Sequence, residues 1–219
     1  MLEKKEYAAQ RTEMIEKQLR RRGINDAAVL AAILAVPRHE FVSEELRAHA
    51  YDDLPLPIGG GQTISQPYIV AAMTAALHLQ PTDRVLEIGT GCGYHAAVLS
   101  RLAKEVFTIE RRPELASAAS AKLARLGYAS AHVHCGDGTL GLPELAPFDA
   151  ILVAAAAPAV PKPLLAQLAE GGRLILPVGE AEHQELQLIE KHGDTFLAKR
   201  LEGCRFVPLV GYHGWQESS

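Results

Sequence analysis

The amino-acid sequence predicts an α/β fold: a doubly wound, mostly parallel sheet with an N-terminal helical extension and a C-terminal antiparallel hairpin. Strand and helix patterns alternate over residues 84–178, which is the order that a parallel sheet with crossover helices requires. Segments 150–153 and 174–176 are continuously apolar, as strands covered on both faces are. Farther along, two alternating segments flank the turn 192–194, which indicates a hairpin.

Two helices are predicted at the N-terminus. Residues 6–22 show an amphipathic pattern with Ala8, Ile15 and Leu19 on one side, and Gly23 follows in the position that a helix C-cap favours. Asn25 or Asp26 can cap the second helix, which Pro37 ends. Its apolar face is expected to comprise Val29, Leu30, Ile33 and Leu34.

A long loop is predicted for residues 51–67, because this segment contains three prolines and three consecutive glycines. Loops of such length in compact domains are usually binding loops or lids, or else disordered. The apolar residues in it favour an ordered loop that packs onto the domain; they are Leu54, Leu56, Ile58 and Ile64. A helix over residues 66–79 follows, with apolar residues at helical spacing.

The sheet itself is expected to contain strands at 84–88, 106–110, 131–135, 148–153 and 173–178, with helices at 94–103, 113–126 and 161–169. The hairpin comprises 184–190 and 195–201, and residues 205–210 are expected to form a last strand. Pro208 gives that strand a free or bulged edge, since proline cannot donate a backbone hydrogen bond. We expect one compact domain, with residues 1–80 as the helical extension and loop and residues 81–219 as the sheet core.

Composition narrows the classes of partner. The chain has 219 residues, a net charge of -4 and a pI near 6.1, which argues against a protein that neutralises nucleic-acid phosphates. Three widely spaced cysteines without a C-x-x-C pair describe neither a disulfide framework nor a zinc ribbon. The N-terminus lacks an apolar signal region, and no segment has the apolar length that spans a bilayer. We therefore expect a cytoplasmic protein without membrane partners.

A glycine-rich turn after the first strand indicates a nucleoside-bearing cofactor on a Rossmann-like sheet. Residues 87–93 have the form E-x-G-x-G-x-G, and Glu110 ends the next strand about twenty residues past Gly89, where such folds place a carboxylate that binds a ribose diol. A dinucleotide fingerprint reads G-x-G-x-x-G, but Tyr94 stands where its small residue is needed. This spacing resembles the S-adenosylmethionine turn of class I methyltransferases. A nicotinamide enzyme and a turn without ligand are the alternatives.

Ser65 is the strongest candidate for a functional side chain in the long loop. Its position before Gln-Pro and a helical pattern suits a helix N-cap, which is the commoner role of such a serine. No G-x-S-x-G motif surrounds it, so a hydrolase nucleophile is not expected. A serine hydroxyl at the start of a helix can also position a substrate, so the two roles are compatible.

Other polar residues allow two interpretations. Asp137, between two glycines at the end of the third strand, can bind an adenine amino group or form an ordinary turn. His132 and His134 share a strand face but have no third ligand at metal spacing, so no metal is expected. Cys92 is assigned to packing. After Val153 the chain lacks the Asn/Asp-Pro-Pro-aromatic motif that holds a flipped base, which also disfavours a nucleic-acid substrate.

Taken together, several segments resemble the protein-L-isoaspartate O-methyltransferase family over roughly residues 10–210. The most specific is 56–67, Leu-Pro-Ile-Gly-Gly-Gly-Gln-Thr-Ile-Ser-Gln-Pro; the others are 36–38, 41–42, 85–94, 136–138, 148–151, 176–179 and 206–209. The resemblance implies that Ser65 is the active-site residue and that Glu110 and Asp137 hold ribose and adenine. The usual family turn has a small polar residue at Cys92 and glutamine at His95.

The resemblance implies methyl transfer from S-adenosylmethionine to the free carboxylate of L-isoaspartyl residues in damaged peptides and proteins, with S-adenosylhomocysteine as product. Repair then proceeds through a succinimide. The expected cofactor contacts are Glu87, Gly89, Thr90, Gly91, Gly93, Glu110, Asp137 and Gly138. The expected substrate contacts are Ile58, Thr63, Ile64, Gln66, Val207, Pro208 and Leu209. Three alternatives remain at this point: a methyltransferase for a small carboxylate or hydroxyl, a nicotinamide oxidoreductase, and a non-catalytic cofactor-binding regulator.

Overall fold

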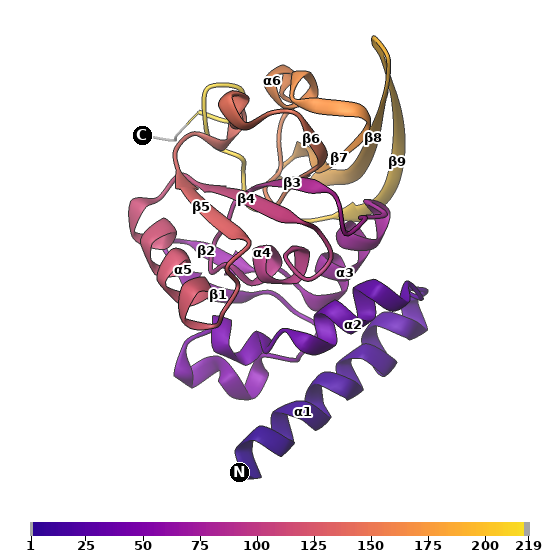
Figure 1. The fold of residues 1–219 in the computed structure, drawn as a ribbon. Coiled ribbons are helices and arrows are strands. Elements are labelled where there is room, and N and C mark those ends of the chain that lie inside the picture. Colours follow the sequence, from indigo (N-terminus) through magenta and orange to yellow (C-terminus); the bar gives the residue numbers. More distant parts are fainter. Residues whose placement is uncertain (1, 217–219) are drawn as a thin grey trace.

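The computed structural model describes residues 2–216 as an α/β fold built on one large sheet (Figure 1). Seven strands lie in the order β5-β4-β3-β6-β7-β8-β9. The first five run parallel to their neighbours, while β8 and β9 continue the sheet antiparallel. The predicted fold class is thereby confirmed. The strands are β3 Arg84–Ile88, β4 Glu105–Glu110, β5 Ala131–Cys135, β6 Phe148–Val153, β7 Leu168–Glu180, β8 His183–His192 and β9 Thr195–Cys204.

Strand β3, the middle one of the five parallel strands, pairs with β4 on one side and with β6 on the other, so the order of the chain reverses at β3. Open α/β sheets bind ligands at the carboxyl ends of the strands beside such a reversal. Three helices make the crossovers around it: α4 Tyr94–Leu99, α5 Pro113–Arg125 and α6 Lys162–Ala166.

Apolar side chains cover both faces of the sheet. Val85 and Val106 are fully buried in a core that also contains residues of α2, α3 and α4. The neighbouring Leu86 and Ile109 point into a second core on the opposite face, against α6. Burial on two faces explains the nearly continuous apolar runs in these strands.

The N-terminal extension packs beneath the sheet (Figure 1). Helix α1 Leu2–Met14 continues through a π-helical turn, Ile15–Leu19, and a 3-10 turn, Arg20–Arg22. Gly23 ends it with φ 91°, a left-handed conformation that favours glycine. Helix α2 Ala27–Ala35 begins after Asp26, whose carboxylate accepts two backbone N–H groups of α2 at 2.9 and 3.0 Å.

Two residues expected on the apolar faces of these helices are exposed instead. Over residues 6–22, burial is confined to Met14, Ile15 and Leu19, and Ala8 faces solvent. Leu34 is 44% exposed. Periodicity alone identified the correct helices but overestimated the width of their buried faces. Two 3-10 turns, Arg38–Phe41 and Glu44–His49, then lead to the segment that was predicted as a loop.

That segment, residues 51–67, contains a small hairpin of β1 Leu56–Gly59 and β2 Gln62–Ile64, followed by helix α3 Pro67–Ala76. The glycines at positions 59, 60 and 61 all have positive φ, 93°, 58° and 71°, so they form the tip of the hairpin. The expectation of an ordered segment is confirmed, but the strands were missed because the glycines and prolines mask a short pairing.

Two further expectations at the C-terminal end are wrong. The helix predicted at 161–169 ends at Ala166, because β7 begins at Leu168. Residues 205–210 do not form a strand of the large sheet; Pro208 makes one isolated bridge, with Ala156. The reason is that the buried Gln184 side chain binds both the N–H and the C=O of Phe206, at 2.6 and 3.2 Å, where a neighbouring strand would pair.

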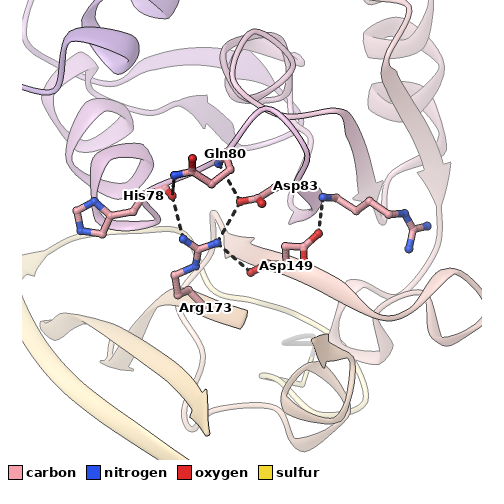
Figure 2. Close-up of polar contacts among 6 residues, drawn as sticks. His78, Gln80, Asp83, Asp149 and Arg173 are labelled. Atoms are coloured by element: carbon pink, nitrogen blue, oxygen red, sulfur yellow. Dashed lines mark hydrogen bonds and ion pairs between the residues drawn. The ribbon is translucent and has the colours of Figure 1, made fainter. Parts of the chain in front are cut away.

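A polar network fixes the amino ends of β3, β6 and β7, at the edge of the sheet away from the strands' carboxyl ends (Figure 2). The Arg173 guanidinium donates to the Asp83 carboxylate at 3.0 Å and to the backbone C=O of His78 at 2.9 Å. Asp83 also accepts the Gln80 N–H at 3.0 Å. Asp149 accepts the backbone N–H of the first β3 residue at 2.8 Å. These bonds tie the end of α3 to the sheet.

Candidate active site

An open cavity of about 250 Å³ lies at the carboxyl ends of β3, β4 and β6, the position that the strand order predicts. Its wall is completed by the segment before α3 and by the chain after β9. Of the residues predicted to bind cofactor or substrate, the cavity wall contains Thr63, Ile64, Ser65, Gly89, Thr90, Gly91, Glu110, Gly138, Val207, Pro208 and Leu209. Off the wall lie Ile58, Gln66, Glu87, Gly93 and Asp137.

Four backbone N–H groups of the glycine turn are already bonded within the protein. Gly89 and Thr90 donate to the C=O of Ile109, at 2.8 and 3.2 Å, and Gly93 donates to Thr90 at 2.9 Å. The N–H of Gly91 donates to the Glu110 carboxylate at 3.0 Å. A pyrophosphate would need these donors and would meet a carboxylate at the same point. The geometry therefore favours a nucleoside without phosphates over a dinucleotide.

Glu110 is suited to hold a ribose. Its side chain is 6% exposed and lies on the cavity wall. One carboxylate oxygen accepts from Gly91 and the other from the Arg112 N–H, both at 3.0 Å, and each oxygen keeps capacity for a second donor. The two hydroxyls of a ribose can supply those donors. The residues present thus fit the nucleoside of S-adenosylmethionine.

Glu87 lies behind the turn. It is fully buried, and the Thr108 hydroxyl donates to one of its oxygens at 2.5 Å. Thr90 approaches the same hydroxyl at 2.7 Å, so a chain of three side chains links the turn to β4. Burial, together with the nearby Glu110 charge, raises the pKa of Glu87 to about 8 against the bond from Thr108. We assign Glu87 to supporting the turn, because it does not reach the cavity wall.

The third glycine of the turn, Gly93, lies where helices α4 and α5 pack closely. Gly93 has φ 88° and precedes α4, and a Cβ at this position would lie 3.2 Å from Leu123 of α5. Gly93 thus lets α4 and α5 approach closely, and its predicted contact with the cofactor stays a prediction. Gly138 does line the cavity, and a Cβ there would lie 2.4 Å from the Ile88 side chain.

Asp137 stabilises a turn, which was the second of the two roles predicted for it. Its carboxylate accepts the hydroxyl and the N–H of Thr139, at 2.7 and 2.9 Å, and the N–H of Tyr212 at 2.7 Å. Burial would raise the pKa of Asp137, but these bonds outweigh it and hold the pKa below its usual value. The side chain anchors the C-terminal segment beside Gly138, and its contact with adenine stays a prediction.

The hairpin β1–β2 rests on the glycine turn. A Cβ on Gly91 would lie 3.1 Å from the end of the Ile58 side chain, and one on Gly60 would lie 3.5 Å from the Arg112 side chain. Ile58 therefore packs over the turn rather than facing the cavity. The hairpin leads directly into Ser65, so the same contacts place that residue relative to the turn.

Ser65 does not cap α3. The residue before the helix is Gln66, and no side chain caps the first turn; across residues 2–216, no hydrogen bond of the Ser65 hydroxyl is found. The half-buried Ser65 lines the cavity instead. Gln66 points away and donates to the C=O of Asp53 at 2.9 Å, so its predicted substrate contact is not supported by the geometry.

Three titratable residues that the sequence did not assign to the site also line it: Cys92, Tyr94 and His95. Burial raises the pKa of the Cys92 thiol and raises that of Tyr94 to about 12. Burial, aided by the Arg38 charge, lowers the pKa of His95 to about 3. All three are consequently neutral near pH 7, and none is poised as a general base.

His95 is held by Thr74 of α3. The Thr74 hydroxyl donates to the Val70 C=O at 2.7 Å and meets Nε2 of His95 at 2.9 Å. Since a hydroxyl has one proton, Nε2 of the neutral ring must donate. Helical spacing gave no signal for this pairing, because the two residues come from different helices.

The segment after β9 forms the opposite wall. Val207 C=O and Leu209 N–H both bind Ala156, at 2.8 Å each. Further cavity residues that were not predicted are Gln62, Val70, Ile88, Ile109, Arg111, Arg112, Ala154, Ala155, Val210 and Gln216. Those that follow a strand's carboxyl end could have been found from the topology, whereas Gln216 and Val70 could not.

Among residues 2–216 no three His, Cys, Asp or Glu side chains come together as a possible metal site. None of the helices in this part of the chain has the length and apolar character needed to cross a membrane.

The sequence is similar to those of known proteins along nearly its whole length. The family model for protein-L-isoaspartate(D-aspartate) O-methyltransferase matches residues 9–214. The Pelobacter propionicus protein-L-isoaspartate O-methyltransferase 2 is 59% identical over 92% of this chain and 91% of its own length. The Roseiflexus castenholzii protein-L-isoaspartate O-methyltransferase is 57% identical over 96% of both chains.

Two solved structures of proteins with the same name are also similar to this chain. A protein-L-isoaspartate O-methyltransferase superposes with a TM-score of 0.84 at 32% identity, over 93% of this chain and 67% of its own. A Plasmodium falciparum protein, a candidate enzyme of the same name in complex with S-adenosyl-L-homocysteine, has a TM-score of 0.80 at 28% identity, covering 91% and 98%. With a site built for a phosphate-free nucleoside and relatives that span nearly its whole length, the chain belongs to the protein-L-isoaspartate(D-aspartate) O-methyltransferase family.

Proposed function

We propose that this chain methylates the free carboxylate of L-isoaspartyl residues in damaged peptides and proteins, with Glu110 holding the cofactor ribose and Ser65 orienting the substrate. S-adenosylmethionine, when bound, supplies the methyl group from its sulfonium. The observation that carries the proposal is the Glu110 carboxylate at the cavity wall, bonded to the Gly91 N–H at 3.0 Å. That bond removes a phosphate donor and leaves acceptors for a ribose.

The reaction needs alignment rather than a base. The substrate carboxylate has a pKa of about 4 and is ionised at pH 7, so no residue must remove a proton. The neutral Cys92, Tyr94 and His95 side chains agree with this requirement. A hydrogen bond from Ser65 orients the carboxylate, and the hairpin 56–64 excludes water, which raises the reactivity of an anion towards a cation.

The peptide backbone pairs with the segment after β9. Since Val207 and Leu209 already bond Ala156, the groups that pair are the Pro208 C=O and the Val210 N–H, which point away from Ala156 in an extended segment. Backbone pairing recognises the misplaced carboxylate with little dependence on the surrounding sequence. We further propose that the protein acts in the cytoplasm, without nucleic-acid, membrane or metal partners.

A matched pair of peptides tests the function. Purified protein is incubated with labelled S-adenosylmethionine and either an isoaspartyl peptide or its aspartyl twin. We expect transfer to the isoaspartyl peptide alone. Equal labelling of both peptides, or labelling only of small carboxylates or hydroxyl compounds, would reject the proposal in favour of a less specific methyltransferase.

Replacing Ser65 by Ala tests the role of its hydroxyl. We expect kcat to fall about 10- to 100-fold, because one orienting hydrogen bond to a charged group is lost, while the affinity for S-adenosylhomocysteine stays the same. Single-turnover kinetics and calorimetric titration measure the two quantities. A loss of cofactor affinity with unchanged turnover of the loaded enzyme would contradict the assigned role.

A further inference from the structure

A second hollow, of about 420 Å³, adjoins the cavity. Pro208 lines both of them, and the consecutive residues Trp215 and Gln216 line the hollow and the cavity respectively. The hollow is therefore continuous with the proposed peptide path rather than being a separate surface depression. We call it the flanking pocket; its other lining residues are Glu180, Ala181, Gln184, Arg205 and Phe206.

The walls of the flanking pocket are held in place. Gln184 is 6% exposed, and its amide binds the backbone N–H and C=O of Phe206 at 2.6 and 3.2 Å. Trp215 donates its indole N–H to the Ala156 C=O at 2.9 Å, and Ala156 also fixes the backbone on both sides of Pro208. A pocket that needs no rearrangement loses little affinity to ordering.

The pocket favours an apolar side chain. The Phe206 and Trp215 rings are half-buried and the Pro208 ring is exposed, so apolar surface remains open in a preformed hollow. Two charges lie on its wall, Arg205 and Glu180, and their opposite signs give no preference for a charged ligand. In the described part of the chain neither takes part in an ion pair.

We propose that the flanking pocket binds a large apolar side chain, aromatic above all, of a residue within two positions of the isoaspartyl residue in the substrate peptide. An extended peptide advances roughly 3.3 Å per residue. A peptide paired with Pro208 and Val210 thus carries a neighbouring side chain past Pro208 into the hollow. This assignment rests on the proposed function and adds a sequence preference to it.

The test uses a set of isoaspartyl hexapeptides in which Phe replaces Ala at positions -2, -1, +1 and +2 in turn. We expect one position at which Phe lowers KM about 10-fold, the effect of burying part of an aromatic side chain. Ala181→Phe fills the pocket from a turn residue that has no positive φ. In this variant the ratio of kcat/KM between the Phe and Ala peptides should fall to about 1. Glu182→Phe, in the same turn but off the pocket wall, should keep the wild-type ratio.

Each outcome has one meaning. If no Phe position lowers KM, or if the preference survives Ala181→Phe, the flanking pocket is overturned while the proposed function stands. A loss of the preference in Glu182→Phe as well would also overturn it, because the effect would not depend on filling the hollow. If no isoaspartyl peptide is methylated at all, the proposed function fails and this assignment fails with it. S-adenosylhomocysteine binding by each variant confirms that it is folded.

Discussion

Glu87 combines complete burial with an incomplete set of hydrogen bonds. One oxygen accepts the Thr108 hydroxyl, and the other is buried without a partner in the described residues. An ionised carboxylate in such a place is costly, which is why burial raises the pKa of Glu87 to about 8. At neutral pH the side chain is mostly a neutral acid, which limits the repulsion with Glu110.

Replacing Glu87 by Gln should change how stability depends on pH. Between the unfolded pKa of about 4.5 and the folded pKa of about 8, the folded protein holds a proton that the unfolded chain releases. The free energy of unfolding of the wild type therefore falls as pH rises through this window, by at most about 1.4 kcal/mol per pH unit. The amide of the Glu87→Gln variant cannot titrate, so the free energy of unfolding of the variant lacks this decrease with pH.

The measurement is urea unfolding of both proteins at pH 4, 6 and 8. The variant should gain stability relative to the wild type as pH increases, by an amount on the order of a few kcal/mol in total. A difference between the two proteins that does not vary with pH would mean that Glu87 has an ordinary pKa in the folded state.

For single residues, spacing along the chain predicted which ones lie at the cavity, but it did not show which ones are buried behind the turn. The distance from Gly89 to Glu110 along two parallel strands placed both residues at the cavity, because strand ends coincide in register. Gly93 and Glu87 were predicted as cofactor contacts; Gly93 lies beside α5 and Glu87 is buried behind the turn, so both contacts stay predictions. Which face of a turn a side chain occupies depends on neighbouring elements that no local pattern reveals.

Among the elements, β3, β6 and β7 depend on Arg173 at their amino ends (Figure 2). The Arg173 and Asp83 side chains are 17% and 9% exposed and lie 3.0 Å apart. Removing the cation would leave the nearly buried Asp83 carboxylate without a compensating charge, although Asp83 and the His78 C=O each keep one bond from Gln80. The cost of that desolvation exceeds the net value of the pair itself.

We expect Arg173→Ala to lower the free energy of unfolding by about 3 kcal/mol. Arg200→Ala is the matched control, because the Arg200 and Glu185 side chains are 76% and 51% exposed and their pairing is worth less than about 1 kcal/mol. Denaturant unfolding followed by circular dichroism measures both. Equal losses in the two variants would show that the Arg173 network does not carry the sheet edge.

The elements also show where composition misleads. Three strands, 84–88, 131–135 and 148–153, were predicted with the correct boundaries. Strand 148–153 is a buried, mostly apolar run, whereas 131–135 alternates with histidines and is not buried, so its place in the repeating strand–helix order identified it. The hairpin β1–β2 was missed, since its strands have four and three residues with glycines at the tip. Segment 205–210 was overpredicted, because a side chain from β8 takes the place of a strand partner.

For the whole molecule, the predicted division at residue 80 does not coincide with a break in the core. Leu19 and Ile33 of the extension pack in the same cluster as Val85 of β3 and Leu186 of β8. Helix α2 contacts both α3 and α4. Since the extension and the sheet bury the same apolar surface, we predict that they unfold together.

Two intrinsic signals can test that cooperativity. Trp215 is the single tryptophan of the chain and reports on the wall of the site, whereas far-ultraviolet circular dichroism reports largely on the helices, many of which lie in the extension. Thermal transitions followed by the two signals should coincide, and S-adenosylhomocysteine should shift both by the same amount. Leu19→Ala, at a position with 0% exposure, should destabilise the protein by about 2 to 5 kcal/mol and lower both midpoints equally. If circular dichroism changes first in this variant while Trp215 fluorescence keeps its native midpoint, the extension folds as a separate unit and the sheet does not depend on it.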